Sequence, residues 1–172
     1  EYDALLILDD VRAGFRLDMG GSSEYFGFTP DLTCFCKALA NGYVISAAVG
    51  NDRVKNAASQ VFFTGSYFAS AVEMAASLAC LAELEKTRAI DHMMRLGTKL
   101  QEGLRAKAES HGLQVNVTGP PTLPTMTFAN ETNFRRMQRF SGESAKRGVI
   151  FHPHHNWFLI ATHTDADIER AL

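Results

Sequence analysis

The sequence has few cysteines, no long apolar run and no excess of either charge. Its three cysteines are an odd number, and Cys34 and Cys36 lie close together in an apolar stretch, so we expect reduced thiols rather than a disulfide framework. No apolar run approaches the roughly 20 residues that span a bilayer, and the chain does not open with a basic segment before an apolar one. We therefore expect no membrane span and a cytoplasmic setting.

The charge balance also narrows the class of partner. A net charge of -2 gives no dense basic face, which argues against nucleic acid or an anionic membrane as the partner. The chain has 172 residues, 46% of them hydrophobic, so it can bury the core of one domain or of one domain with a small appendage. Chemistry on small molecules is the expectation that remains.

Neither end of the sequence reads as a natural domain edge. Glu1 leads almost directly into an apolar run, and Leu172 falls inside a predicted helix. We therefore expect the chain to be a fragment of a longer protein.

Two apolar runs of strand length end beside residues that can carry chemistry. The continuous run ALLIL at 4–8 favours a strand buried on both faces of a parallel sheet, and Asp9 follows it. The run LTCFC at 32–36 is a second strand-like segment, and Lys37 follows that one. Residues 44–49 predict a further strand.

Two helices are predicted in the middle of the chain. Val72–Lys86 is rich in Ala, Leu, Glu and Met, and Ser70 is the candidate N-cap. Asp91–Glu109 carries apolar residues at spacings that form one stripe, and His111 and Gly112 mark its end.

After Leu113 the pattern changes to short strands around a polar helix, which is typical of an α+β unit. That helix is predicted at Asn133–Arg147. The last helix begins at Thr164, where TDAD fits a capping box with Asp167 in place of the usual Glu. The strands are predicted at Gln114–Val117, Thr125–Phe128, Val149–Phe151 and Trp157–Ala161.

Asp9 and Lys37 are the residue pair that indicates a reaction. In open α/β sheets ligands bind beyond the carboxyl ends of the strands, and both residues follow such ends. A lysine there is costly unless it is paired or chemically used, and imine formation removes its permanent charge. A carboxylate against a pyridine nitrogen keeps that nitrogen protonated, so that the ring can accept an electron pair.

Four segments around this pair match a known family in order and spacing: LLILDDVRAGFR (5–16), EYFGFTPDLT (24–33), KALANGY (37–43) and ISA (45–47). They resemble the class III aminotransferases, specifically the glutamate-1-semialdehyde aminomutase type. The resemblance implies that pyridoxal 5'-phosphate forms an internal aldimine with Lys37. It also implies that Asp9 is the partner of the pyridinium nitrogen and that Val11 lies against one face of the ring.

A glycine-serine loop before the first long helix is similar to the family segment that reaches the cofactor phosphate of the neighbouring subunit. The segment is TGSYFAS at 64–70, and alignment on Met74 places Ser66 at the hydroxyl position, with Thr64 as the second candidate. A Gly-Ser loop at a helix start also suits an anion, because free backbone N–H groups and a hydroxyl converge there. The resemblance therefore implies a homodimer with shared active sites.

The resemblance extends over nearly the whole chain, because GVIFHP (148–153) and ATHTDADI (161–168) look like the family's small domain. It implies an α/β fold: the C-terminal part of the large PLP-dependent transferase (fold type I) domain, with a mostly parallel sheet, at 1–88. A connecting helix at 89–110 and a truncated small α+β domain at 111–172 follow. The implied reaction moves an amino group from a small-molecule donor to a carbonyl acceptor, or performs a 1,2-amino shift within one molecule.

Four features depart from the family pattern. Asp10 stands where the family more often has Glu, which shortens the side chain and is expected to loosen its hydrogen bonds. No arginine after Pro120 matches the substrate-carboxylate arginine of the ω-amino-acid branches, which argues against an α-carboxylate substrate. Cys34 and Cys36 have no family role. The family's first half, with its phosphate loop and stacking aromatic ring, is not in this sequence.

Simpler interpretations stand beside each of these assignments. Lys37 read alone is a surface lysine after a strand, Asp9 is an N-cap or turn residue, and Ser66 is an ordinary loop serine. The alternative to an enzyme is a catalytically incomplete fragment or remnant that keeps the fold and at most binds the cofactor. A further cluster consists of three histidines, and with no fourth ligand at a recognisable spacing we expect no metal site there: His152, His154 and His155.

Overall fold

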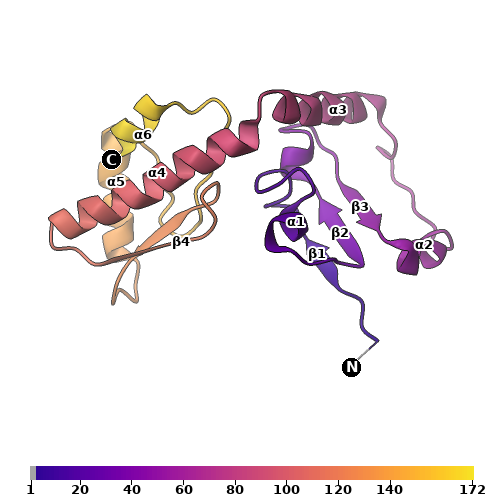
Figure 1. Cartoon of the computed structure of the whole chain (residues 1–172), viewed down its shortest axis with the longest axis horizontal. Coiled ribbons are helices and arrows are strands. Elements are labelled where there is room, and N and C mark those ends of the chain that lie inside the picture. The colour runs from indigo at the N-terminus through magenta and orange to yellow at the C-terminus, as the bar shows by residue number, and fades with distance from the viewer. Residues whose placement is uncertain (1–2) are drawn as a thin grey trace. The chain divides into compact units, whose positions relative to one another are not determined.

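The chain folds into two compact units in the computed structural model, which describes residues 3–172 (Figure 1). The first unit runs to Arg88 and the second from Ala89 to Leu172. The first contains β1 (Ile7–Asp9), α1 (Ser22–Phe26), β2 (Leu32–Phe35), the 3-10 turn η1 (Lys37–Leu39), β3 (Ala47–Gly50), α2 (Asp52–Ala58) and α3 (Ala71–Lys86). The second contains α4 (Ala89–Ser110), β4 (Val115–Thr118), β5 (Thr125–Phe128), α5 (Arg135–Lys146) and α6 (Asp165–Ala171).

The sheet of the first unit is mixed. β1 pairs with β2 in parallel, and β2 pairs with β3 antiparallel, in the order β1-β2-β3. The expected mostly parallel sheet is therefore not confirmed by the strands in the described part of the chain. Only residues 36–46 connect β2 to β3, which is too short for the crossover that parallel neighbours need.

β1 differs from the expectation of a strand buried on both faces. It lies at the edge of the three-stranded sheet, and the side chains of Leu5, Leu6 and Ile7 are about half exposed. The continuous apolar run has the sequence of a buried strand, but an edge strand has one neighbour rather than two. The strand expected at 44–49 begins only at Ala47 and ends at Gly50, after a turn with Asn41 and Gly42 at positive φ.

The two long helices form where the sequence predicts them. α3 begins after Ser70, whose hydroxyl contacts the Glu73 carboxylate rather than a free backbone N–H group. α4 extends from Ala89 to Ser110, and Gly112 ends it with a φ of 66° that a residue with a side chain rarely adopts.

The second sheet contains two of the four strands that the sequence predicts. β4 and β5 pair antiparallel, whereas residues 149–151 and 157–161 form no strand. In the second of these segments, Trp157 N donates to Pro124 O (2.7 Å) and Leu159 N donates to Thr122 O (3.1 Å). Proline has no N–H group, so Pro124 cannot return a bond and no ladder forms.

The core of the second unit lies between α4 and the two-stranded sheet. Figure 1 shows α4 running along β4 and α6. The apolar stripe of α4 faces inward, as predicted, and meets the sheet, α5, α6 and the irregular segment near the C-terminus. The buried members are Met93, Leu96, Leu100, Leu104, Val117, Met126, Met137, Phe151, Trp157, Leu159 and Ile168.

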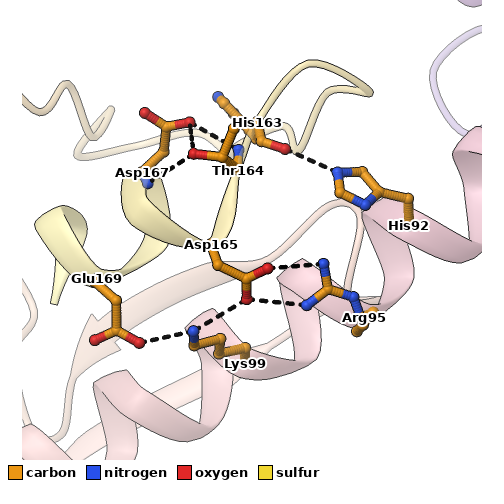
Figure 2. A network of polar contacts seen from close by, with 8 residues as sticks. All are labelled: His92, Arg95, Lys99, His163, Thr164, Asp165, Asp167 and Glu169. Carbon is orange, nitrogen blue, oxygen red and sulfur yellow. Dashed lines mark hydrogen bonds and ion pairs between the residues drawn. The ribbon is translucent and has the colours of Figure 1, made fainter.

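Polar contacts attach α6 to α4 (Figure 2). The predicted capping box is confirmed: the Asp167 backbone N–H donates to Thr164 Oγ1, and the Asp167 carboxylate accepts from the Thr164 backbone N–H (2.7 Å). Arg95 donates two hydrogen bonds to the Asp165 carboxylate, at 2.9 and 3.0 Å. Lys99 contacts the same carboxylate at 3.1 Å. These bonds fix the last helix onto the longest one.

Candidate active site

The parallel pairing brings the ends of β1 and β2 to the same edge of the sheet. Asp9 is the last residue of β1, and its register partner on β2 is Cys34. β2 ends at Phe35, and Lys37 follows in η1. Neighbouring strands lie about 4.8 Å apart, so Asp9 and Lys37 stand at adjacent strand ends on one edge of the sheet.

The two faces of this sheet differ in burial. Side chains alternate along a strand, and Asp9 lies on the face where Ile7 is exposed. The opposite face carries Asp10, Thr33 and Phe35, all of them buried under the glycine-rich segment that follows β1. The face that carries Asp9 is therefore the accessible one, whereas its neighbour Asp10 belongs to the covered side.

A local hydrogen bond orients the Asp9 carboxylate. The Val11 backbone N–H donates to Asp9 Oδ1 at 3.2 Å, two residues along the chain. Val11 itself is half-buried at the start of the turn. The carboxylate is therefore held at the strand end by its own backbone, in the manner of an Asx turn.

Lys37 sits in an unusual backbone conformation. Its φ is 45°, in the left-handed region that residues other than glycine seldom occupy. The turn is held by the Asn41 N–H, which donates to Lys37 O at 2.9 Å, and by Cys80 Sγ of α3, which lies 3.4 Å from Ala38 O. Burial raises the pKa of the Cys80 thiol, which keeps it protonated as a donor. The Lys37 side chain is exposed.

Thr64 and Ser66 lie in a different hollow of the first unit. It measures about 350 Å³, and its lining includes Ser46 and Tyr67 but neither Asp9 nor Lys37. The loop that carries both hydroxyls is exposed, and the rings of Phe63 and Phe68 meet edge to face beside it at 5.2 Å. Thr64 and Ser66 therefore line a hollow to which Asp9 and Lys37 do not contribute.

The three clustered histidines are engaged with their neighbours. His154 N donates to His152 Nδ1 (3.1 Å), His154 Nε2 lies 3.2 Å from Gln138, and His155 Nδ1 lies 2.7 Å from Asn156 O. Across residues 3–172 no group of three or more His, Cys, Asp or Glu side chains is arranged to hold a metal ion. Nor, over the same residues, is any helix both long and apolar enough to cross a membrane.

Sequence reasoning gave no positive role to two residues that brace this site. Asp10 was noted only as a departure from the family, but it is buried and bonds to Ser22 at 2.6 and 2.8 Å, so the expected loosening of its bonds does not occur. Cys80 lies far along the chain from the turn that it contacts. The burial of Asp10 beside the exposed Asp9 is seen only in the folded chain, and nothing in the sequence singled out Cys80.

Comparison with known proteins decides the family. A sequence profile described as Aminotransferase class-III matches residues 1–166. The chain belongs to the class-III aminotransferase family. It is 41% identical over 172 residues to an aminopentol aminotransferase of Sphingopyxis macrogoltabida, covering the whole of this chain and 41% of the relative. A glutamate-1-semialdehyde 2,1-aminomutase of Akkermansia muciniphila is 32% identical, with 99% of this chain and 44% of the relative covered.

A solved structure agrees with this assignment. The FumI protein of Sphingopyxis sp. MTA144, in its PLP internal aldimine form, superposes with a TM-score of 0.93 at 41% identity. The match covers 98% of this chain and 41% of that protein. This class-III aminotransferase chain therefore has the mixed α/β structure of part of a fold type I enzyme, and it spans about two fifths of the length of the relatives that it matches.

The residues at the sheet edge fit the cofactor of this family in their chemistry. An exposed amine and an exposed carboxylate follow the ends of adjacent strands, and an aliphatic residue lies two positions after the carboxylate. The strained backbone at Lys37 is typical of a functional position. Thr64 and Ser66 offer hydroxyls that suit a phosphate, on a surface of their own.

Proposed function

We propose that this chain carries the reactive residues of a pyridoxal 5'-phosphate-dependent enzyme that transfers amino groups. The observation that supports this most is the placement of Asp9 and Lys37 at adjacent ends of the parallel strands β1 and β2, in a chain of the class-III aminotransferase family.

Each residue at the edge has a distinct task. Lys37 Nζ would hold the cofactor covalently and, as a free amine, would carry the proton that is removed from the substrate carbon. Asp9 would keep the pyridine nitrogen protonated, and the Val11 N–H group holds that carboxylate in place. The aliphatic side chain of Val11 would contact the ring. When bound, pyridoxal 5'-phosphate supplies the electron sink for the pair left on the substrate carbon.

Transfer between two molecules is the reaction that we favour over a 1,2-amino shift. The chain is 41% identical to an aminotransferase and 32% identical to an aminomutase. The substrates are a small amino donor and a carbonyl acceptor.

A second copy of the chain completes the site in this proposal. The loop before α3 exposes large apolar side chains, with Phe62 and Tyr67 each 89% exposed. Apolar patches of this kind mark contact surfaces. Ser66 lies within this loop, away from Asp9 and Lys37 of its own chain, so its hydroxyl would serve the phosphate in the other subunit, with Thr64 as the second candidate.

The lysine assignment is tested by substitution in the holoenzyme. Lys37→Ala should abolish the visible absorbance of the lysine-bound cofactor, whereas Lys55→Ala, which changes an exposed lysine in α2, should keep it. A Lys37→Ala protein with the absorbance of the wild type would overturn the assignment.

The shared site is tested with mixed subunits. Ser66→Ala removes a hydrogen bond to a charged group, worth about 1.5 to 3 kcal/mol, and should weaken cofactor binding roughly 10- to 100-fold. Thr64→Ala should weaken it less. Mixing Ser66→Ala with Lys37→Ala subunits should restore one tight site per hybrid dimer, because that site has both residues intact. If every mixture binds as weakly as the parents, Ser66 does not act across subunits.

A further inference from the structure

Asp10 is buried and hydrogen-bonded to Ser22 on the covered face of the sheet. Its side chain is 1% exposed. Its Oδ2 accepts a hydrogen bond from the Ser22 backbone N–H at 2.8 Å, and its Oδ1 accepts one from the Ser22 hydroxyl at 2.6 Å. Burying a carboxylate is unfavourable unless it is hydrogen-bonded, and bonds to an ionised acceptor are roughly twice as strong as neutral ones.

The backbone of Asp10 connects the same point to two further segments. Its N–H donates to Cys34 O of β2 at 3.0 Å, and its carbonyl accepts from Gly14 N at 2.9 Å. One residue therefore joins the end of β1 to the end of β2, to the turn after β1 and to the first residue of α1.

Neighbouring atoms fill the space around the Asp10 side chain. Gly21 adopts a φ of 89°, and a Cβ there would lie 2.7 Å from Asp10 Oδ2 and 3.0 Å from the ring of Phe35. At that distance something must shift, so the segment approaches Asp10 as closely as only a glycine permits. The short aspartate side chain thus suits the space that it fills.

We propose that Asp10 is a positioning residue for Asp9. The two side chains leave consecutive residues on opposite faces of the strand end. The hydrogen bonds of Asp10 on the covered face therefore hold the backbone from which the Asp9 carboxylate projects. They hold it in place relative to the end of β2 that leads into Lys37. Asp10 touches neither cofactor nor substrate. This inference rests on the proposed role of Asp9 and adds the residue that orients it.

The test is a pH titration of the visible absorbance of the lysine-bound cofactor in the holoenzyme. If Asp9 is displaced, the pyridine nitrogen loses its proton and its positive charge. The imine nitrogen is then easier to protonate, because that positive charge no longer repels the added proton. In Asp10→Ala the titration midpoint should therefore rise by about one pH unit. Asp10→Asn can still accept from the Ser22 N–H and donate to the Ser22 hydroxyl, and should stay close to the wild-type midpoint.

A control separates positioning from a general loss of stability. Gln101, buried in the second unit, donates to Gly119 O at 2.9 Å, so Gln101→Ala also removes a hydrogen bond of a buried side chain. It should lower the melting temperature and leave the midpoint unchanged. A wild-type midpoint in Asp10→Ala, or an equal rise in Gln101→Ala, would overturn the inference.

Two further outcomes are distinguishable. If Asp10→Ala does not fold, Ser22→Ala carries the test, because it removes only the hydroxyl donor and should move the midpoint in the same direction by a smaller amount. An unchanged midpoint in Ser22→Ala would then contradict the inference. If wild type and Lys37→Ala have the same visible absorbance, the proposed function is wrong. The role of Asp10 as a positioning residue is then wrong as well.

Discussion

Gly97 of α4 is the position where one added methyl group should reveal how closely the core of the second unit is packed. A Cβ at this residue would lie 1.8 Å from the carbonyl oxygen of Pro121 and 2.4 Å from its carbonyl carbon. The backbone at Pro121 would have to move by roughly 1.5 to 2 Å to restore an ordinary contact. Pro120 and Pro121 are adjacent, and their fixed φ angles leave the segment little freedom to move.

Two opposing effects set the size of the change in Gly97→Ala. Alanine favours the helix over glycine by about 1 kcal/mol, whereas overpacking a closed core costs about 1 to 3 kcal/mol and more where backbone must shift. Because the neighbour is backbone, we expect the second effect to dominate, with a net loss of about 2 kcal/mol in the free energy of unfolding.

Gly142 provides the matched control, since it also lies in a helix but a Cβ there would meet nothing within 4 Å. Gly142→Ala should therefore gain about 0.5 to 1 kcal/mol. Urea unfolding followed by circular dichroism measures both variants. The packing argument is refuted if Gly97→Ala is as stable as the wild type while Gly142→Ala is stabilised.

Two further predictions concern the same unit. Hydrogen bonds from Arg95, and next in size from Lys99, lower the pKa of Asp165 to about 2. The ionised carboxylate therefore stabilises the fold above the pKa of about 3.9 that it has in the unfolded chain, and this stabilisation is lost as the pH falls towards 2. The melting temperature of Asp165→Asn should therefore lie below that of the wild type at pH 6, with the gap closing below pH 4; a gap that persists at pH 2 would contradict this. Leu96→Ala, at a fully buried residue (0% exposed), should cost about 2 to 5 kcal/mol in urea unfolding, whereas Ile150→Ala, at a residue 88% exposed, should change stability by no more than about 0.5 kcal/mol; equal effects would show that the burial is misjudged.

The elements that the sequence predicts well are those with strong local signals. α3, α4 and α5 follow from apolar spacing and composition, and the capping box at Thr164 from four residues. Residues 157–161 have the composition of a strand yet form none, because a ladder needs a partner with free N–H groups and Pro124, which accepts from Trp157, has none. Residues 149–151 likewise form no strand. Pairing partners and strand direction depend on residues distant in the sequence. A strand near β3 could therefore be predicted from its own residues, but its antiparallel direction could not.

The candidate site shows the same division. Asp9 and Lys37 could be proposed from their positions after apolar runs and from the family segments around them. The groups that brace them could not, because the contacts of Asp10 with Ser22 and of Cys80 with Ala38 join residues 12 and 42 positions apart. The separate location of the Thr64–Ser66 loop likewise follows only from the folded chain.

Borohydride reduction of the holoenzyme tests the proposed bond between Lys37 and the cofactor most directly. Reduction makes that bond permanent, and mass spectrometry of the peptides then locates it. We expect a phosphopyridoxyl group on the peptide that contains Lys37 and on no other lysine of residues 3–172. A modified peptide elsewhere in this chain, with Lys37 unmodified, would contradict it.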